Sequence, residues 1–212
     1  MSKAAELAKL IGDGTFGTGG AEDKKIVFDG NAQDFHIGLD DSADDLVIGL
    51  GSALGTTTHM AFTEDGEVTK PLQPAFMVNK STEQSNIATG SEVSVSFDTE
   101  QYDIGSNFAS NTFTAPVTGK YLLRVSLYLR NVDTAASYYR VDLNTSNREY
   151  RWMEGFNTDG GDYEYYVANV TAIADMDASD TATVGITQNG GTAQTDIDTD
   201  GARTYFQGYL LG

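Results

Sequence analysis

The segment DIDTDG, at residues 196–201, carries a dense set of carboxylate oxygens. Asp196, Asp198 and Asp200 stand at alternate positions and a glycine follows. Carboxylates at positions 1, 3 and 5 and a glycine at position 6 form the first half of a calcium-binding loop. The second half is missing, because Gln207 stands at position 12, where an EF-hand has a bidentate glutamate. An EF-hand is therefore excluded. Two interpretations remain, a simpler oxygen-ligand calcium loop or a solvated hairpin turn that ends in Asp-Gly.

A second cluster of binding chemistry lies in residues 148–166, where aromatic side chains are mixed with carboxylates and amides. Aromatic faces beside such groups can bind sugars, so we predict receptor contact through Trp152, Asn157, Asp159 and Asp162. In strands of period two, half of the aromatic residues must instead lie in the core or at a subunit interface. Two carboxylates about 5 to 9 Å apart would also suit glycoside hydrolysis, which makes a polysaccharide depolymerase the third functional alternative.

Nucleophilic and metal chemistry find little support elsewhere in the sequence. The chain has no cysteine, and its two histidines are His36 and His59. No Ser-His-Asp order, phosphate-binding loop, dinucleotide fingerprint or zinc-ligand spacing occurs. On a threefold axis, three copies of either histidine could bind a transition metal, although a hydrogen-bonded or exposed histidine is the commoner case. We therefore predict a non-enzymatic protein with no catalytic residues and no cofactor other than calcium.

These residues belong to an acidic chain of 212 residues, with 13 Lys+Arg against 31 Asp+Glu and a formal net charge of -18. Affinity for nucleic acid comes from cations that neutralise phosphates, so we predict no nucleic-acid partner. No run of about 18 apolar residues could cross a bilayer, so we predict no membrane partner. The 23 glycines, three prolines and many Thr, Tyr and Val residues favour an all-β fold of short strands joined by glycine turns.

Residues 1–20 are predicted to attach the chain to a larger assembly. Ala4, Leu7, Ala8 and Ile11 fall on one face of a short helix, at i, i+3, i+4 and i+7. A helix of about three turns is marginal on its own, so a partner must stabilise it. The glycine-rich residues 12–20 then form a flexible tether.

Residues 21–74 predict a β-repeat shaft that ends in a proline linker. Short strand-like runs alternate with acidic and glycine turns, and the sequence Ile-Gly-Leu recurs eleven residues apart, at Ile37 and Ile48. A strip of this kind cannot close a core alone, so identical strips from other chains should cover its apolar side chains. Examples of these side chains are Val27, Phe28 and Val47. Two prolines in residues 71–74 favour an extended connection.

Residues 75–212 predict an antiparallel β-sandwich or jelly roll. Strand-length runs with period two occupy residues 92–97, 120–130, 138–144, 163–173, 181–187 and 203–211. In the run that contains Tyr121, Leu123 and Val125, these three residues should alternate inward. For the closing strand, two core sets are open, either Phe206, Tyr209 and Leu211 or Tyr205 and Leu210.

The start of this domain resembles the signature of C1q-like domains, the trimeric jelly rolls related to the tumour necrosis factor fold. The signature spacing of aromatic, acidic and glycine positions is matched by Phe97, Asp103, Phe108, Phe113, Gly119 and Tyr121. Four residues rather than six separate Phe108 from Phe113, and Leu123 and Val125 stand where the family has aromatics. Those two replacements keep the strand face apolar. The resemblance implies a trimeric C1q-like jelly-roll head over residues 75–212.

Residues 24–62 resemble the β-repeat segments in fibre and other virion structural proteins of tailed phages, particularly marine ones. The resemblance implies a homotrimeric virion protein, a short fibre or surface decoration located in the virion. Residues 1–20 would anchor it to other virion proteins, and the head would bind a host glycan or surface protein. The alternative is a C1q-like binding or adhesion module on a cell surface.

Overall fold

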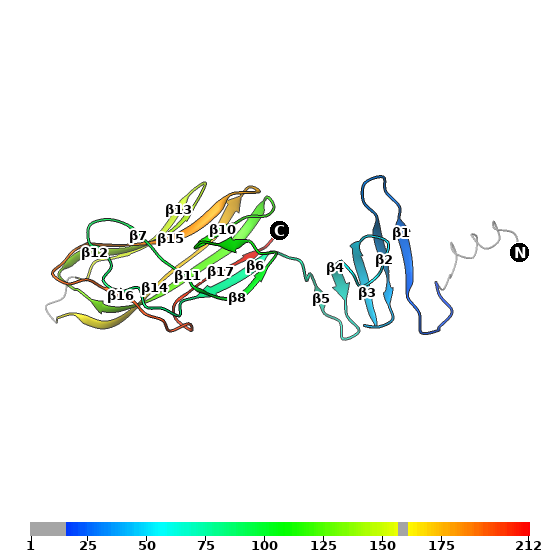
Figure 1. The fold of residues 1–212 in the computed structure, drawn as a ribbon, viewed down its shortest axis with the longest axis horizontal. Coiled ribbons are helices and arrows are strands. Elements are labelled where there is room, and N and C mark those ends of the chain that lie inside the picture. Colours follow the sequence, from blue (N-terminus) through cyan, green and yellow to red (C-terminus); the bar gives the residue numbers. More distant parts are fainter. Residues whose placement is uncertain (1–15, 157–160) are drawn as a thin grey trace, which may run out of the picture. The chain divides into compact units, whose positions relative to one another are not determined.

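The computed structural model describes residues 16–156 and 161–212, and every regular element in these residues is a β-strand. The chain divides into two compact units between Gln73 and Pro74 (Figure 1). The helix predicted through Ala4, Leu7, Ala8 and Ile11 lies outside the described residues. Within the described ranges, no helix has the length and apolar character needed to cross a membrane.

The N-terminal unit is one antiparallel sheet in which each strand pairs with the next along the chain. Its strands are β1 (Lys24–Phe28), β2 (Phe35–Asp40), β3 (Asp45–Leu50), β4 (Thr58–Phe62) and β5 (Val68–Thr69). The two Ile-Gly-Leu sequences lie in β2 and β3, where Ile37 pairs directly with Ile48. The repeat predicted from the sequence is thus a pair of neighbouring antiparallel strands.

One face of this sheet is apolar from one edge strand to the other, and we call it the N-terminal apolar face. Cross-strand pairing places its members opposite one another. They are Ile26, Phe28, Phe35, Ile37, Leu39, Leu46, Ile48, Leu50, Met60, Phe62 and Val68. Phe28 was predicted among the exposed apolar residues and lies here, whereas Val27 and Val47 lie on the opposite face. Val47 is 3% exposed, so the expectation that it needs a second chain to cover it is wrong.

The chain itself covers the central strands of that opposite face. Nδ1 of His36 hydrogen-bonds to the carbonyl of Gly51 at 2.9 Å. Gly55 of the same loop lies against Asp40, since a Cβ placed on Gly55 would be 2.9 Å from a carboxylate oxygen of Asp40. His36 is near the start of β2 and Asp40 is its last residue, so the loop at 51–57 extends along the whole strand. His36 and Asp40 are both buried beneath it.

The C-terminal unit consists of two antiparallel sheets. The first, which we call the β11 sheet, has the order β14-β11-β17-β6-β8, and β16 also pairs with β11. The second, the β12 sheet, has the order β13-β12-β15-β10-β9, and β7 also pairs with β15. The strand bounds are β6 (Ala75–Asn79), β7 (Val93–Ser94), β8 (Thr99–Ile104), β9 (Phe108–Ala109), β10 (Thr112–Thr114), β11 (Gly119–Val132), β12 (Ala136–Thr145), β13 (Glu149–Glu154), β14 (Tyr163–Met176), β15 (Thr181–Gly190), β16 (Asp196–Ile197) and β17 (Tyr205–Leu210).

The chain crosses repeatedly from one sheet to the other. It passes from β10 to β11, returns to β12 and β13, crosses to β14, returns to β15 and closes with β17. Two antiparallel sheets connected by such crossings form a jelly roll. The antiparallel sandwich predicted for residues 75–212 is confirmed.

The sandwich core lies between the two sheets. Tyr121, Leu123 and Val125 are fully buried, as the period of two predicted. The closing strand differs from both predicted sets, because Phe206 and Leu210 are its buried large side chains. Tyr209 and Leu211 are 45% and 48% exposed, so Tyr209 and Leu211 do not belong to the core.

Candidate interaction surface

The outer face of the β11 sheet carries most of the exposed aromatic and aliphatic side chains of the sandwich strands. Successive residues of a strand point to opposite faces, so the residues between the buried positions of β11 face outward. Leu122 pairs with Ile173 of β14 on one side and with Tyr209 of β17 on the other. These three side chains are 38%, 58% and 45% exposed. They form an apolar row across three strands of the sheet, toward the linker end of β11.

A second row runs parallel to the first. Tyr102 of β8 pairs with Met77 of β6, which pairs in turn with Gln207 of β17. Gln207 pairs with Arg124 of β11. Neither row contains a carboxylate, although the chain is strongly acidic. We call the surface formed by these two rows the sandwich apolar face.

The same sheet face becomes aromatic and cationic toward the other end of β11. The rings of Tyr128 and Tyr165 stack with centroids 5.3 Å apart. The guanidinium of Arg203 lies 4.7 Å from the centre of the Tyr128 ring, and that of Arg130 lies 5.9 Å from the centre of the Tyr165 ring. Cation–π contacts of this kind hold arginine side chains against the sheet. Burial lowers the pKa of the Arg130 guanidinium, but the charge of Asp198 and other nearby groups outweighs it and the pKa is raised.

This end of the sandwich lies opposite its attachment to the linker. At the linker end, the Leu210 amide donates to the Pro74 carbonyl, and Gly119, the first residue of β11, pairs with Met176. At the far end, Val132 of β11 pairs with Tyr163, the first residue of β14. The connections that follow β11, β13 and β15 therefore gather at the far end (Figure 1).

The predicted calcium residues are near this far end, but their carboxylates have separate partners. Asp196 accepts hydrogen bonds from the Asn86 amide at 2.7 Å and from the Asn131 side chain at 2.8 Å. Asp198 lies 3.3 Å from Nε of Arg130, an ion-pair distance without hydrogen-bond geometry.

Asp200 accepts a hydrogen bond from the Ala202 amide at 3.0 Å, and its other oxygen lies 3.4 Å from Arg203. The Asp200 amide in turn donates to the Asp198 carboxylate at 3.1 Å. These contacts are typical of Asx turns. In residues 16–156 and 161–212, no three acidic or histidine side chains are grouped to hold a metal ion. Calcium binding by this loop remains a prediction.

Two of the four predicted receptor residues are described. Asp162 accepts hydrogen bonds from the amide and the hydroxyl of Thr134, at 2.9 and 3.1 Å, and so joins two far-end connections. Trp152 is half-buried and packs against Phe156 and Tyr166, with ring centroids 6.4 and 5.6 Å away. Its ring thus supports the sandwich. Asn157 and Asp159 lie outside the described residues.

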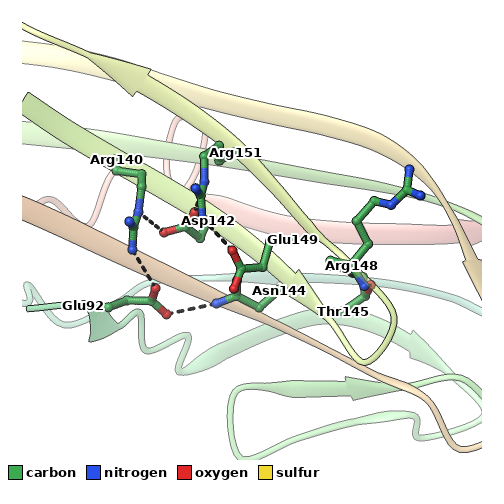
Figure 2. A network of polar contacts seen from close by, with 8 residues as sticks. All are labelled: Glu92, Arg140, Asp142, Asn144, Thr145, Arg148, Glu149 and Arg151. Atoms are coloured by element: carbon green, nitrogen blue, oxygen red, sulfur yellow. Dashed lines mark hydrogen bonds and ion pairs between the residues drawn. The ribbon is translucent and has the colours of Figure 1, made fainter.

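The outer face of the β12 sheet is different in character, because its charged side chains pair with one another. Asp142 is fully buried and receives Nε of Arg140 at 2.5 Å and Nε of Arg151 at 2.9 Å (Figure 2). Arg140 also pairs with Glu92, and Arg151 with Glu149. This network was not predicted from the sequence. The alternation of Arg140, Asp142 and Asn144 in one strand was its only sequence signal, since Glu92 lies far away in the chain.

The known proteins to which this chain is similar are solved structures. No family model matches the sequence, and no curated protein matches it. Among solved structures, the chain is similar to the globular domain of zebrafish complement 1qA, with 14% identity, 66% of this chain and 98% of that chain covered, and a TM-score of 0.46. It is also similar to murine APRIL, with 15% identity, coverage of 66% and 99%, and a TM-score of 0.47. A third similar structure is the Eiger TNF of S. frugiperda, with 13% identity, 66% of this chain and 93% of that chain covered, and a TM-score of 0.49. The fold assignment rests on the strand order described above.

Proposed function

We propose that this chain is a non-enzymatic structural and binding protein that assembles as a homotrimer through the sandwich apolar face. The contrast between the two outer faces of the sandwich carries this proposal. The β12 sheet satisfies its own charges, whereas the β11 sheet leaves Tyr102, Ile173 and Tyr209 each at least 45% exposed. Exposed apolar surface grouped on one side of a domain is typical of a protein interface.

A copy of the same chain suits this face because of charge. Two chains that each carry a net charge of -18 repel one another, so close contact requires a surface without carboxylates. The two rows of the sandwich apolar face meet that requirement. Closed rotational symmetry then limits the assembly to a fixed number of subunits, and three is the number that we propose.

The far end of the sandwich is the part that we propose for receptor binding. Loops carry recognition while a rigid scaffold holds them in place. The far-end connections are joined by the Asp162–Thr134 hydrogen bonds, and they stand beside Tyr128, Tyr165 and Arg203. Exposed aromatic rings with cationic and acidic neighbours suit a host-surface glycan or protein. Calcium bound by residues 196–201 would add to this contact.

The setting that we propose is a phage virion, with the protein as a short fibre or surface decoration. The basis is the resemblance of residues 24–62 to phage fibre segments, together with a distinct N-terminal β unit in front of the sandwich. Ala4, Leu7, Ala8 and Ile11 would attach the chain to other virion proteins. A C1q-like module on a cell surface is the second candidate, and the strand order of the sandwich favours it equally.

The first test of the proposed trimer is the mass of the full chain in solution. Three chains of 22.7 kDa give about 68 kDa by light scattering. Leu122→Lys and Ile173→Lys should each place cations in the interface and reduce the mass toward that of a monomer. Met153→Lys is the control, because Met153 is 60% exposed on β13 of the other sheet. A monomeric parent chain, or equal loss of mass in the control, would refute the proposal.

The proposed location in a virion and the proposed absence of enzymatic activity are tested by separate measurements. Labelled antibody should bind purified virions if the virion setting is correct, and should bind only producing cells if the adhesion module is correct. Particles that lack residues 75–212 should lose adsorption to the host. A polysaccharide turnover assay should detect no cleavage, and release of new reducing ends would favour the depolymerase alternative instead.

A further inference from the structure

The N-terminal apolar face has no cover among the described residues of its own unit, apart from one corner. Phe28 and Val68, at opposite edges of the sheet, are 61% and 55% exposed. Between them, Phe35, Leu39 and Phe62 are each more than 40% exposed. Phe16 borders a shallow apolar hollow with Ile26, Ile37, Leu39 and Leu46 at the β1 corner. The rest of the face is not covered by any described residue of its own unit.

Acidic residues are absent from the strand positions of this face. The carboxylates within strands β1–β5 are Asp40 and Asp45, which pair with each other and belong to the opposite face. The one charged strand position on the apolar face is Lys24, opposite Leu39 at its edge, and the Lys24 ammonium pairs there with the Glu22 carboxylate, which belongs to no strand of the sheet. A highly acidic partner of the same sequence could therefore approach this surface without like-charge repulsion.

The size of the face decides between two occupants, the chain's own residues 1–15 and other copies of the chain. Five strands about 4.8 Å apart make a sheet about 24 Å wide. A single segment, even as a helix about 10 Å across, would cover only about two of the five strands. The corresponding sheets of the other two copies of a trimer, each of the same width, would together cover all five.

We infer that the N-terminal apolar face is a second self-association surface, which meets the same faces of the other two copies around the threefold axis. The inference rests on the proposed homotrimer. The face measures about 400 Å², so each copy would bury at most about that area, less than the roughly 800 Å² per partner that a stable complex usually buries. Copies already joined through their sandwiches would hold these faces at millimolar effective concentration, which makes the smaller contact sufficient.

Cross-linking of the full chain tests this directly. The chain contains no cysteine, so an introduced thiol is unique. Ile48→Cys places it at the centre of the face, between Ile37 and Met60, and Phe62→Cys places a second one toward β5. Facing sheets lie about 10 Å apart, so a bis-maleimide of about that span should join two chains. Val117→Cys is the control, because Val117 is 45% exposed in a turn of the other unit.

We expect covalent pairs of chains from Ile48→Cys and Phe62→Cys at low micromolar concentration, on the order of tenfold more than from the control. Both thiols should also react slowly with a monofunctional maleimide. Rapid labelling without cross-links would refute the inference. Protection without cross-links, relieved by deletion of residues 1–15, would also refute it and would identify that segment as the cover.

The mass of the same samples separates this inference from the proposed function. A trimer that gives no cross-links through Ile48→Cys or Phe62→Cys would leave the sandwich interface standing and remove the second surface. A monomer without cross-links would remove both. Cross-links that persist when Leu122→Lys has abolished the trimer would keep the second surface and refute its dependence on the sandwich interface.

Discussion

The buried carboxylate of Asp142 offers the sharpest test of how the β12 sheet is stabilised. Asp142→Asn keeps the size of the side chain and removes its charge. In the parent chain, Asp142 accepts one hydrogen bond from each of two guanidinium groups, those of Arg140 and Arg151 (Figure 2). In the variant, one arginine loses its buried acceptor and the other keeps only a neutral amide oxygen, beside the partly exposed Glu92 and Glu149.

The expected loss follows from the strength of these two bonds. A hydrogen bond between charged groups contributes about 1.5 to 3 kcal/mol. The Arg140 and Arg151 side chains are 25% and 44% exposed, so solvent screening reduces the contribution of each bond. We therefore expect a loss of about 2 to 3 kcal/mol in the free energy of unfolding. For a domain of this size that corresponds to a decrease in Tm of roughly 6 to 12 °C.

Thermal unfolding followed by circular dichroism or calorimetry measures this loss. Glu149→Gln is the matched control, because it removes a carboxylate that is 63% exposed and pairs with the same Arg151. Exposed pairs contribute about 0 to 1 kcal/mol, so the control should shift Tm by a few degrees at most. Equal Tm values for the two variants would refute the structural interpretation of the network. Its charges would then be candidates for ligand contact.

Three further predictions follow from individual residues. Leu210→Asp should bury an unpaired charge and abolish folded protein. Leu211 is 48% exposed, so Leu211→Asp should leave Tm within about 1 °C of the parent value. Unchanged melting of both variants would show that β17 is a loose tail. Gly49→Ala should make the N-terminal unit sensitive to protease, because the added Cβ would lie 2.7 Å from the His36 ring; parent-like resistance would contradict this close packing. Burial raises the pKa of Asp133, but amide hydrogen bonds outweigh it and the pKa is lowered. Ionised Asp133 therefore stabilises the fold above about pH 4. The Tm difference between the parent and Asp133→Asn should narrow as the pH falls below about 4, because the carboxylate becomes protonated. A Tm difference that does not change with pH would show that ionisation of Asp133 does not contribute to stability.

The sequence predicted the sandwich where one strand face is distinctly more apolar than the other. In β11, Tyr121, Leu123 and Val125 alternate with polar or less buried neighbours, so the period of two identifies the core face. In β17, adjacent apolar residues at Tyr209, Leu210 and Leu211 leave the inward face undefined. In the structure, the inward face of β17 is the one that carries Gly208, which lies between Phe206 and Leu210 in the strand. An added Cβ on Gly208 would lie 2.5 Å from the Phe76 ring. That contact joins residues far apart in the chain and has no local signal.

The N-terminal unit was less predictable for the same reason. In β3, Val47 and Ile48 are both apolar and β-branched, so the strand has no period from which to choose a face. The buried side becomes defined only when the loop at 51–57 folds over His36 and Asp40. The sequence thus predicted that the strip needs a partner, but it wrongly included Val47, which the chain itself buries, among the side chains that other chains should cover.

The candidate surfaces required tertiary information. The ion-pair network depends on Glu92, which reaches Arg140 across 48 positions of the chain. The sandwich apolar face depends on the register that places Tyr209, Leu122 and Ile173 in one row. Each of these residues alone is an ordinary exposed apolar side chain in a strand. Only the order of strands in the β11 sheet brings them together.

The proposed self-association in a single arrangement would explain both the strong negative charge and the two apolar faces. Chains with a net charge of -18 repel one another in most orientations, so random contact between their surfaces is suppressed. The two rows of the sandwich apolar face and the N-terminal apolar face carry no carboxylate, so the proposed contacts would escape this repulsion. Like-charge repulsion elsewhere would then select the orientation in which those faces meet, while the apolar contact would supply the favourable free energy.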